Sequence, residues 1–410
     1  MLDTACLLGI ARLLYVLLSS LSTFTLFLIL LWTVYHTPIV LAAVFSRRDK
    51  DDPPGDNYLP RVSVIIPVKN DVSIAERSLR SVAVQDYPRD KIEVVVVDGS
   101  SDDVSEKIKA SIQGFPLDVK YIREDTPNGK PSALNRGLRH VSGELVAVLD
   151  ADNVLEPDAF RNAVKYFSDP TVGAVQGVID PLNEKESIWT RIASKEEKLW
   201  NRVLLLGRAR LGLFTPLSGS CYFVSRRALQ EIGGFPNTLA EDLDLSLSLL
   251  KKGYRVVYAE DVRGKWETPK TLGALVVQRR RWYRGYLESF FRNWRIIGPD
   301  RRRLDAEVVM AGPLLLVLSF LTIMWWLLIT TLGLPKLNGD ISAYIVTSLN
   351  FFTVLTVGSA LSFGEKPRRL TNIAWIPIVY AYWLTMMSVA LWAFLGVLFR
   401  RPAKWERTPK

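Results

Sequence analysis

The sequence predicts an α/β protein with a mostly parallel sheet and with apolar, membrane-spanning helices at both ends of the chain. Strand-like and helix-like segments alternate from residue 60 onward, which is the pattern of a parallel sheet. A buried-strand pattern over residues 145–149 runs directly into Asp150 and Asp152. Long uncharged runs lie before and after this central region. These observations predict a ligand-binding domain attached to a membrane.

The first apolar run covers residues 5–45 and contains only Arg12 and His36 as basic residues and no acidic residue. A bilayer core needs about 20 apolar residues, so this run is too long for one upright span. It predicts either one span with an interfacial piece or a tight hairpin. A secretory signal is disfavoured because its apolar core would be about 7–15 residues long. We therefore expect an N-terminal transmembrane segment at residues 1–46.

Three uncharged runs follow the central region, at residues 308–333, 341–363 and 371–399. Each is long enough to cross a bilayer core, which predicts three transmembrane helices within residues 308–399 and a basic tail at residues 400–410. Arginines at both borders of the central region predict, by the positive-inside rule, a cytosolic domain in an integral protein of the plasma membrane. One span before this domain and three after it would put the basic tail outside, so either the tail is an exception or one segment re-enters without crossing.

The remaining composition excludes several classes of protein. The formal net charge is +10, but the basic residues follow the membrane borders, so we expect no nucleic-acid partner. The chain has two cysteines, Cys6 and Cys221, and two histidines, which predicts neither a disulfide framework nor a zinc site.

The central region, residues 60–300, predicts a sheet whose functional residues share one edge. Loops that follow predicted strands would carry Pro67, Asp98, Lys130 and Asp150 to the carboxyl edge of the sheet. The predicted strands are 62–68, 92–97, 119–122, 145–149 and 172–178, and the predicted helices are 74–85, 104–112, 132–140 and 158–167. No glycine-rich phosphate loop follows these strands, which argues against a dinucleotide enzyme or a P-loop ATPase.

Two later segments complete this region. Residues 187–213 mix basic and apolar side chains and predict a helix that either lies along the membrane surface or covers the sheet. Residues 218–224 begin with small side chains and continue with apolar ones, as in a strand that enters a tight site.

Three groups of residues are candidates for chemistry. Asp150 and Asp152 suit a divalent cation bound together with substrate phosphates, although an Asx turn that caps the next helix has the same pattern. Glu241 and Asp242 precede a predicted helix over residues 243–252, where they could serve catalysis or cap the helix. The third group comprises Gln278, Arg281 and Trp282, which share one helix face that could also be a solvated basic surface.

The ordered set of motifs resembles the membrane-bound glycosyltransferases of family 2, which include cellulose, chitin, hyaluronan and poly-N-acetylglucosamine synthases. The resemblance covers roughly residues 61–291. It is carried by Asp98, Asp-Ala-Asp at 150–152, Glu241-Asp242, Gln-x-x-Arg-Trp at 278–282, Ser63 to Pro67, Gly129 to Asn135 and Gly233 to Phe235. The resemblance implies a GT-A-type domain that binds a UDP-linked sugar and transfers the sugar with inversion. Ala240 departs from the threonine that polysaccharide synthases often have there.

The resemblance also implies roles for the donor-site residues. Asp98 would contact the nucleotide base, with Pro67 beside it. Lys130 and Asp150 would contact the sugar and phosphate side of the nucleotide. Asp150 and Asp152 would hold Mg²⁺ or Mn²⁺, which stabilises charge on the leaving diphosphate.

The transfer step implies a second set of roles. Asp242 would be the general base, with Glu241 in a supporting role. On the helix at 278–282, Gln278 would bind substrate, Arg281 would pair with the diphosphate and Trp282 would face the acceptor sugar.

Three functions fit these residues. The first is a processive synthase that extends and exports a polysaccharide, and the second is an enzyme that adds one sugar to a membrane lipid. The third is a transporter or sensor, which the uncharged C-terminal runs disfavour. A processive enzyme would hold its polymer on aromatic rings, for which Trp282, Tyr380, Tyr382 and Trp383 are candidates, with Asn350 as a polar partner. Ordinary helix packing explains the last three aromatic residues equally well.

Overall fold

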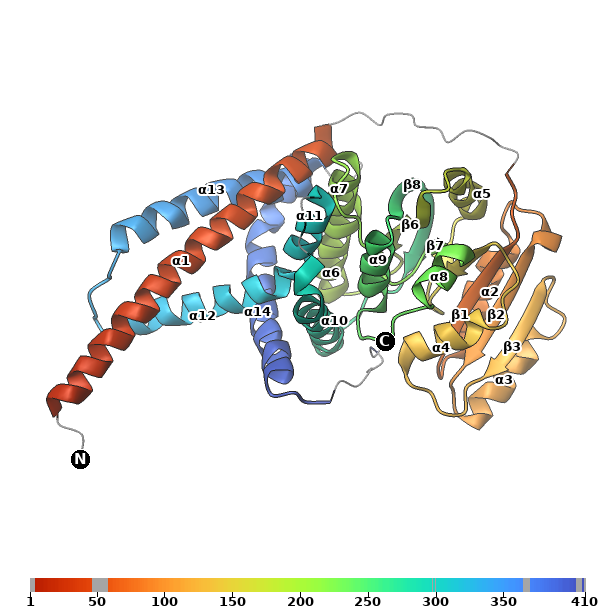
Figure 1. Cartoon of the computed structure of the whole chain (residues 1–410), viewed down its shortest axis with the longest axis horizontal. Helices are drawn as coiled ribbons and strands as arrows, with labels where there is room; N and C mark the ends of the chain where they lie inside the picture. Colours follow the sequence, from red (N-terminus) through yellow and green to blue (C-terminus); the bar gives the residue numbers. More distant parts are fainter. Residues whose placement is uncertain are drawn as a thin grey trace.

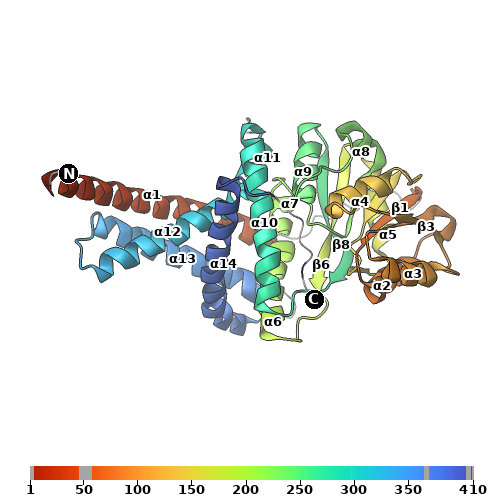
Figure 2. The same cartoon turned by 90° about the horizontal axis from the view of Figure 1, so that it is seen from below.

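The computed structural model describes residues 4–45, 58–296, 298, 300–363, 369–402 and 408. Figure 1 shows a sheet domain on the right, a group of long apolar helices on the left, and a layer of helices between them. Figure 2 shows the same three layers from below.

The sheet confirms the predicted α/β class. Eight strands lie in the order β3-β2-β1-β4-β7-β6-β8-β5. The first four strands of this order are parallel, β7 is antiparallel to both its neighbours, β6 and β8 are parallel, and β5 is antiparallel to β8. In chain order the strands are β1 (Val62–Val68), β2 (Ile92–Asp98), β3 (Asp118–Arg123), β4 (Leu145–Val148), β5 (Val154–Leu155), β6 (Val172–Pro181), β7 (Tyr222–Ser225) and β8 (Arg255–Trp266).

Helices cover both faces of this sheet and explain why its central strands are continuously apolar. Successive side chains of a strand point to opposite faces. Val64 therefore joins the core under α2, α3 and α5, whereas Ile65 joins the core under α4, α8 and α9. These helices are α2 (Val72–Ala83), α3 (Asp102–Ile112), α4 (Gly129–Leu138), α5 (Ala159–Val164) with η2 (Lys165–Ser168), α8 (Arg226–Ile232) and α9 (Glu241–Lys251).

A middle layer separates the sheet from the apolar helices (Figures 1 and 2). It contains α6 (Ile188–Lys198), η3 (Leu199–Leu205), α7 (Leu206–Arg210), α10 (Leu272–Asn293), η4 (Trp294–Ile296) and α11 (Arg301–Met310). The segment α6 to α7 packs against β6 and β8 on one side and against α1 and α14 on the other. The segment therefore covers the sheet, as one interpretation of residues 187–213 predicts, and it also borders the apolar helices. Its position along a membrane surface stays a prediction.

Four helices in the described part of the chain are long and apolar enough to cross a membrane. They are α1 (Thr4–Phe45), α12 (Gly312–Thr331), α13 (Gly339–Phe363) and α14 (Ile376–Leu398), which follows η5 (Leu370–Trp375). The hairpin alternative for the first run is wrong, because α1 is one continuous helix of 42 residues. At 1.5 Å per residue it extends about 63 Å, roughly twice the thickness of a bilayer core. The C-terminal part of α1 packs on α7.

Glu93, near the start of β2, links the neighbouring strands β1 and β3 at the end of the sheet opposite to its carboxyl edge. Its buried carboxylate accepts hydrogen bonds from Ser142 Oγ (2.9 Å), Lys120 Nζ (3.0 Å) and the hydroxyl of Ser63 on β1. Burial alone would raise the pKa of Glu93, but these hydrogen bonds outweigh burial and lower the pKa to about 2. Glu93 therefore stabilises the fold only while it is ionised.

We predict that Glu93→Gln destabilises the protein at neutral pH by about 3 kcal/mol, because each pKa unit corresponds to about 1.4 kcal/mol. The folded pKa lies below the unfolded value, so this stabilisation is present above pH 4.5 and is lost as the pH falls toward 2. The thermal unfolding temperature, measured in detergent, should fall more steeply with decreasing pH across this range for the unmodified protein than for the variant. Glu106→Gln, at an exposed position, controls for the loss of one charge. Equal slopes for Glu93→Gln and the unmodified protein would contradict the prediction.

Candidate active site

One large cavity lies between the carboxyl edge of the sheet and the apolar helices. It has a volume of about 760 Å³. Nearly all of the site residues expected from the sequence line it: Pro67, Lys130, Asp150, Asp152, Glu241, Asp242, Gln278, Arg281 and Trp282. Asp98 is not among its lining residues. The topology thus brings residues from β1, β4, α4, α9 and α10 to one place.

Lys130 on α4 is the central cation of the site. Its Nζ atom lies 2.8 Å from Asp150 Oδ1 and 3.2 Å from Glu241 Oε1, and it donates a hydrogen bond to the carbonyl oxygen of Gly219 (2.5 Å). The side chain is only 8% exposed. Burial would lower the pKa of Lys130, but the charges of Asp150 and Glu241 outweigh it and raise the pKa above the ordinary value. Lys130 therefore remains charged and holds the strand-end carboxylate and the α9 carboxylate together.

Asp242 occupies the first turn of α9, next to Lys130. Its Oδ1 accepts a hydrogen bond from the backbone N–H of Leu243 (2.8 Å). Burial and the neighbouring charge of Glu241 raise the pKa of Asp242 to about 7, while Lys130 opposes the shift. A carboxylate with a pKa near neutrality exchanges a proton readily at physiological pH, as a general base must. The carboxylate of Glu241 instead forms an ion pair with Lys130.

The hydroxyl group of Ser220 holds the Asp-Ala-Asp loop in place. The hydroxyl of Ser220 accepts hydrogen bonds from the backbone N–H of Asp150 (2.8 Å) and from Nδ2 of Asn153 (3.0 Å). Asn153 N donates to the backbone oxygen of Asp150 (2.9 Å), which closes a backbone β-turn, whereas an Asx turn would use the carboxylate of Asp150 as the acceptor. Both aspartates line the cavity, so this backbone turn and the ligand interpretation are compatible.

The donor set fits a divalent cation that a substrate completes. Within the described residues no cluster of three or more His, Cys, Asp and Glu side chains could hold a metal by itself. Asp150 and Asp152 offer two carboxylates, which are suitable ligands for Mg²⁺ or Mn²⁺ when substrate phosphates supply further oxygens. The cavity that they line provides room for such a substrate.

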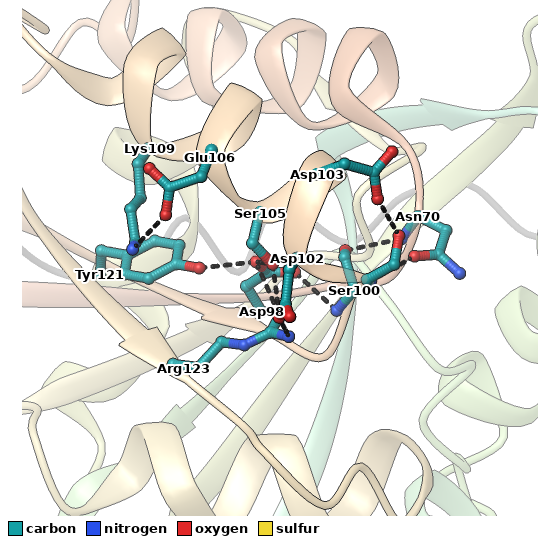
Figure 3. Close-up of polar contacts among 11 residues, drawn as sticks. Asn70, Asp98, Ser100, Asp102, Asp103, Ser105, Glu106, Lys109, Tyr121 and Arg123 are labelled. Carbon is teal, nitrogen blue, oxygen red and sulfur yellow. Dashed lines mark hydrogen bonds and ion pairs between the residues drawn. The ribbon is translucent and has the colours of Figure 1, made fainter.

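Asp98, at the end of β2, is fully buried and surrounded by donors (Figure 3). Its carboxylate accepts hydrogen bonds from Ser100 N (2.9 Å), Ser105 Oγ (2.5 Å) and Tyr121 OH (2.7 Å), and Arg123 Nη1 lies 3.4 Å away. Burial raises the pKa of Asp98, but these hydrogen bonds outweigh it and the pKa is lowered. The carboxylate orders the loop after β2, and its contact with a nucleotide base stays a prediction.

Gly99 presents this ordered loop to the cavity. It lines the cavity in place of its neighbour Asp98. A Cβ atom at Gly99 would lie 2.9 Å from Cβ of Pro127, which also lines the cavity, so only glycine fits without a shift. Sequence reasoning missed Gly99 because a glycine after a strand end is a common turn residue.

Helix α10 presents Gln278, Arg281 and Trp282 to the cavity from one face, as their spacing predicts. Burial lowers the pKa of Arg281, and the charges of Glu241, Asp150 and Asp242 oppose that shift, which places the guanidinium near the carboxylate cluster. The ring of Trp282 lies 6.4 Å from that of Trp266 at the end of β8. Arg281 is thus a second cation beside the aspartates.

Arg279 is a residue of this helix that sequence reasoning missed. It is fully buried, its Nη2 lies 2.8 Å from Glu196 Oε2 on α6, and its guanidinium stacks 4.1 Å from the ring of Trp282. Tyr382 on α14 donates a hydrogen bond to the same Glu196 oxygen (2.8 Å). Three consecutive arginines look alike in the sequence, so only tertiary contacts distinguish Arg279. Tyr382 belongs to this contact and does not line the cavity, unlike Tyr380 and Trp383.

The cavity extends among the apolar helices. Residues from all four of them line it: Ile29, Trp32, Thr33, His36 and Val40 on α1, Gly312, Pro313, Leu315, Leu316 and Ser319 on α12, Leu349, Asn350, Thr353, Thr356 and Val357 on α13, and Tyr380, Trp383 and Met387 on α14. The lining at this end mixes apolar side chains with uncharged polar ones and contrasts with the charged lining around Lys130 and Asp150. A molecule with an apolar body and a polar end would match both parts.

Comparisons with known proteins agree with this geometry. A family model described as "Glycosyltransferase like family 2" matches residues 60–285, which is more than half of the chain. The chain is 30% identical over 375 residues to an N-acetylglucosaminyltransferase of Rhizobium sp. strain N33, and the match covers 88% of this chain and 81% of that protein.

The chain is also similar to a β-monoglucosyldiacylglycerol synthase of Synechocystis sp., with 32% identity over 241 residues. This match covers 58% of the chain and 50% of the synthase, so the chain spans about half the length of that relative. Among solved structures, a mannosyltransferase from Pyrobaculum calidifontis in complex with GDP-Man and Mn²⁺ superimposes with a TM-score of 0.68 and 26% identity. That superposition covers 94% of this chain and 100% of the mannosyltransferase chain.

Proposed function

This chain belongs to glycosyltransferase family 2, and from that premise we propose that it transfers one sugar from a nucleotide diphosphate sugar to a hydroxyl group of a membrane lipid. The observation that carries the proposal is the single cavity that joins the aspartates at the sheet edge to four apolar helices. A lipid acceptor could reach Asp242 along the apolar part while the donor occupies the charged part. The similarity to a β-monoglucosyldiacylglycerol synthase favours the same kind of acceptor.

The residues around the cavity divide into a donor side and an acceptor side. On the donor side, Lys130 and Arg281 would attract the diphosphate. A divalent cation held by Asp150 and Asp152 would neutralise charge on the leaving diphosphate. The presence of GDP-Man and Mn²⁺ in the mannosyltransferase supports such a donor site. A donor sugar linked to uridine diphosphate remains a proposal, since the mannosyltransferase binds a guanosine nucleotide.

Asp242 would act on the acceptor side. Its carboxylate would take the proton from the lipid hydroxyl as the hydroxyl oxygen bonds to the anomeric carbon of the sugar. The bond between that carbon and the diphosphate oxygen breaks at the same time, and its electron pair leaves with the diphosphate. Attack from the face opposite to the leaving group inverts the anomeric configuration. Glu241 supports this step by holding Lys130 in place.

We further propose that the four apolar helices span the plasma membrane and that the sheet domain faces the cytosol. The arginines at the start of α11 precede α12 by about one short helix, which is within the roughly 15–20 residues over which the positive-inside rule expects basic residues on the cytosolic side. Most of the basic tail lies outside the described residues. In this orientation the sheet domain meets both the cytosolic nucleotide sugar and the membrane lipid.

A processive polysaccharide synthase is the second candidate, and one observation favours it. Trp282, Tyr380 and Trp383 all line the cavity, and aromatic rings can bind the apolar faces of sugar rings. The similarity to an N-acetylglucosaminyltransferase over most of the chain is compatible with this activity. The product of the reaction distinguishes the two candidates.

The first prediction from the proposed function concerns the product of the reaction. Purified protein in detergent, supplied with diacylglycerol and a panel of labelled UDP- and GDP-sugars, should give a lipid that carries one sugar. Extraction into organic solvent followed by mass spectrometry would identify it. A ladder of water-soluble oligosaccharides, formed with or without lipid, would instead support the polysaccharide synthase.

A second prediction concerns the general base. Asp242→Asn should lower the transfer rate by about 10²–10⁴-fold while donor binding stays nearly unchanged, because a base acts on the acceptor. In the unmodified enzyme only the ionised carboxylate accepts the proton. The transfer rate should therefore rise with pH through about 7 and then level off.

Asp244→Asn on the same helix is the matched control. Asp244 pairs with Arg292 on α10 (2.6 Å) and does not line the cavity, so this variant should lose stability but keep the pH profile. An equal loss of donor binding and turnover in Asp242→Asn would make Asp242 a donor-site residue.

A third prediction concerns the metal. A chelator should abolish transfer, and added Mn²⁺ or Mg²⁺ should restore it, because the diphosphate adds negative charge beside Asp150 and Asp152, and Lys130 is already paired with Asp150 and Glu241. Asp152→Asn should reduce transfer by about 10²-fold or more with thermal unfolding unchanged. Asp102→Asn, at an exposed position, is the control. Full turnover in excess chelator would refute metal dependence.

A further inference from the structure

A buried polar cluster lies where α1 meets the middle layer. Arg208 on α7 donates to Asp305 Oδ1 on α11 (3.1 Å), and its Nη2 lies 3.1 Å from His36 Nε2 on α1. Tyr35 OH, also on α1, donates to Asp305 Oδ1 (2.5 Å). Arg208 is 1% exposed and Asp305 is completely buried. These four residues, Tyr35, His36, Arg208 and Asp305, are called the α1 cluster below.

Each polar side-chain atom of the α1 cluster except one has a hydrogen-bond partner. His36 Nδ1 lies 2.8 Å from Trp32 O, so Nδ1 carries the proton and Nε2 accepts from Arg208. The second carboxylate oxygen of Asp305 accepts from Phe214 N (3.0 Å). The exception is Nε of Arg208, a buried donor that has no hydrogen-bond partner in the described part of the chain. A buried donor of this kind is unfavourable unless a ligand completes it.

The α1 cluster borders the apolar end of the cavity. Arg208 and His36 both line the cavity, together with Trp32 on α1 and Gly312 on α12. The two apolar neighbours indicate that a ligand reaching Arg208 has an apolar body.

The same cavity connects the α1 cluster to the base. Tyr286, which also lines it, packs in one hydrophobic cluster with Ala240, the residue before the two α9 carboxylates. Burial raises the pKa of Tyr286, the charge of Asp242 raises it further, and the charge of Arg208 lowers it. Asp242, Tyr286 and Arg208 all line this one cavity, so an acceptor that extends along the cavity would meet both Asp242 and Arg208.

We infer that Arg208 is a specificity-determining residue that binds an accepting oxygen in the head of the acceptor lipid while its hydroxyl faces Asp242. The inference rests on the proposed lipid function. The chemistry that Arg208 recognises is an oxygen acceptor beside an apolar body, which an ester carbonyl or a phosphate oxygen supplies. His36 and Asp305 hold the guanidinium in position, so that little side-chain entropy is lost when the lipid binds.

The experiment compares three acceptors in detergent with one labelled nucleotide sugar. Diacylglycerol offers a hydroxyl and ester carbonyls. The corresponding dialkylglycerol ether has the same hydroxyl and chains without carbonyls, and a long-chain alkyl phosphoglycerol has hydroxyls and a phosphate but no carbonyls. We expect the unmodified enzyme to prefer diacylglycerol or the alkyl phosphoglycerol over the ether by 10-fold or more in kcat/KM. Arg208→Gln should remove this preference through KM, with kcat and donor binding nearly unchanged.

Arg210→Gln is the matched control, because Arg210 lies on the same helix and also contacts α1. Its Nη1 donates to the carbonyl oxygens of Ala42 (3.1 Å) and Ala43 (2.9 Å), and it does not line the cavity. This variant should keep the preference for the ester or phosphate lipid. A preference for the phosphate that depends on Arg208 would identify phosphate as the recognised oxygen.

Several outcomes would overturn the inference. Equal kcat/KM for ester and ether in the unmodified enzyme would do so without any variant. A preference that survives in folded Arg208→Gln, as judged by thermal unfolding, would leave the α1 cluster a purely structural contact. Formation of a polymer and no glycolipid by the unmodified enzyme would refute the proposed function itself, and with it this inference.

Discussion

The site depends on one buried cation. Lys130 lies within 3.2 Å of carboxylates from β4 and α9, and without it Asp150, Glu241 and Asp242 would face one another across a cavity with little screening. Removing one partner of such a buried pair typically costs about 3–5 kcal/mol, because the remaining charge has no compensation. Lys130 also limits the pKa of Asp242 to about 7, where burial and Glu241 alone would push it higher. The same contact thus positions the carboxylates and limits the pKa of Asp242, which we propose as the base.

Helix α10 connects the charged residues of the site with the apolar helices. One of its faces carries Arg281 to the carboxylates, while Arg279 pairs with Glu196 on α6. Glu196 in turn accepts a hydrogen bond from Tyr382 on α14. A displacement of α14 would therefore act on the helix that holds Arg281 and Trp282. The residues around the carboxylates and the apolar helices thus share structural parts, which suits the proposed transfer from a water-soluble donor to a lipid.

Local patterns in the sequence predicted most of the sheet edge but not the contacts between distant segments. Buried strands followed by polar loops predicted where Pro67 and Asp150 lie, and helical spacing predicted the shared face of Gln278 and Trp282. The strand β8 was missed, as was the enclosure of Asp98 by hydroxyl groups from α3 and β3. The continuous helix α1 was also undetermined, because an apolar run carries no signal that separates one helix from a hairpin. Pairs such as Arg208 and Asp305 become visible only after folding.

The loop from Leu217 to Cys221 contacts residues that line different parts of the cavity. Gly219 offers its carbonyl oxygen to Lys130, and its φ of +80° is a conformation that glycine adopts without strain. Ser220 supports the Asp-Ala-Asp backbone, while Ser218 Oγ accepts a hydrogen bond from Trp200 Nε1 (3.3 Å) in the π-helix η3. Residues of that wider helix line the cavity on the side that we propose for the acceptor. Contacts to the proposed donor side and to the proposed acceptor side therefore converge on three consecutive residues, and we expect a change in the loop to affect the binding of both substrates.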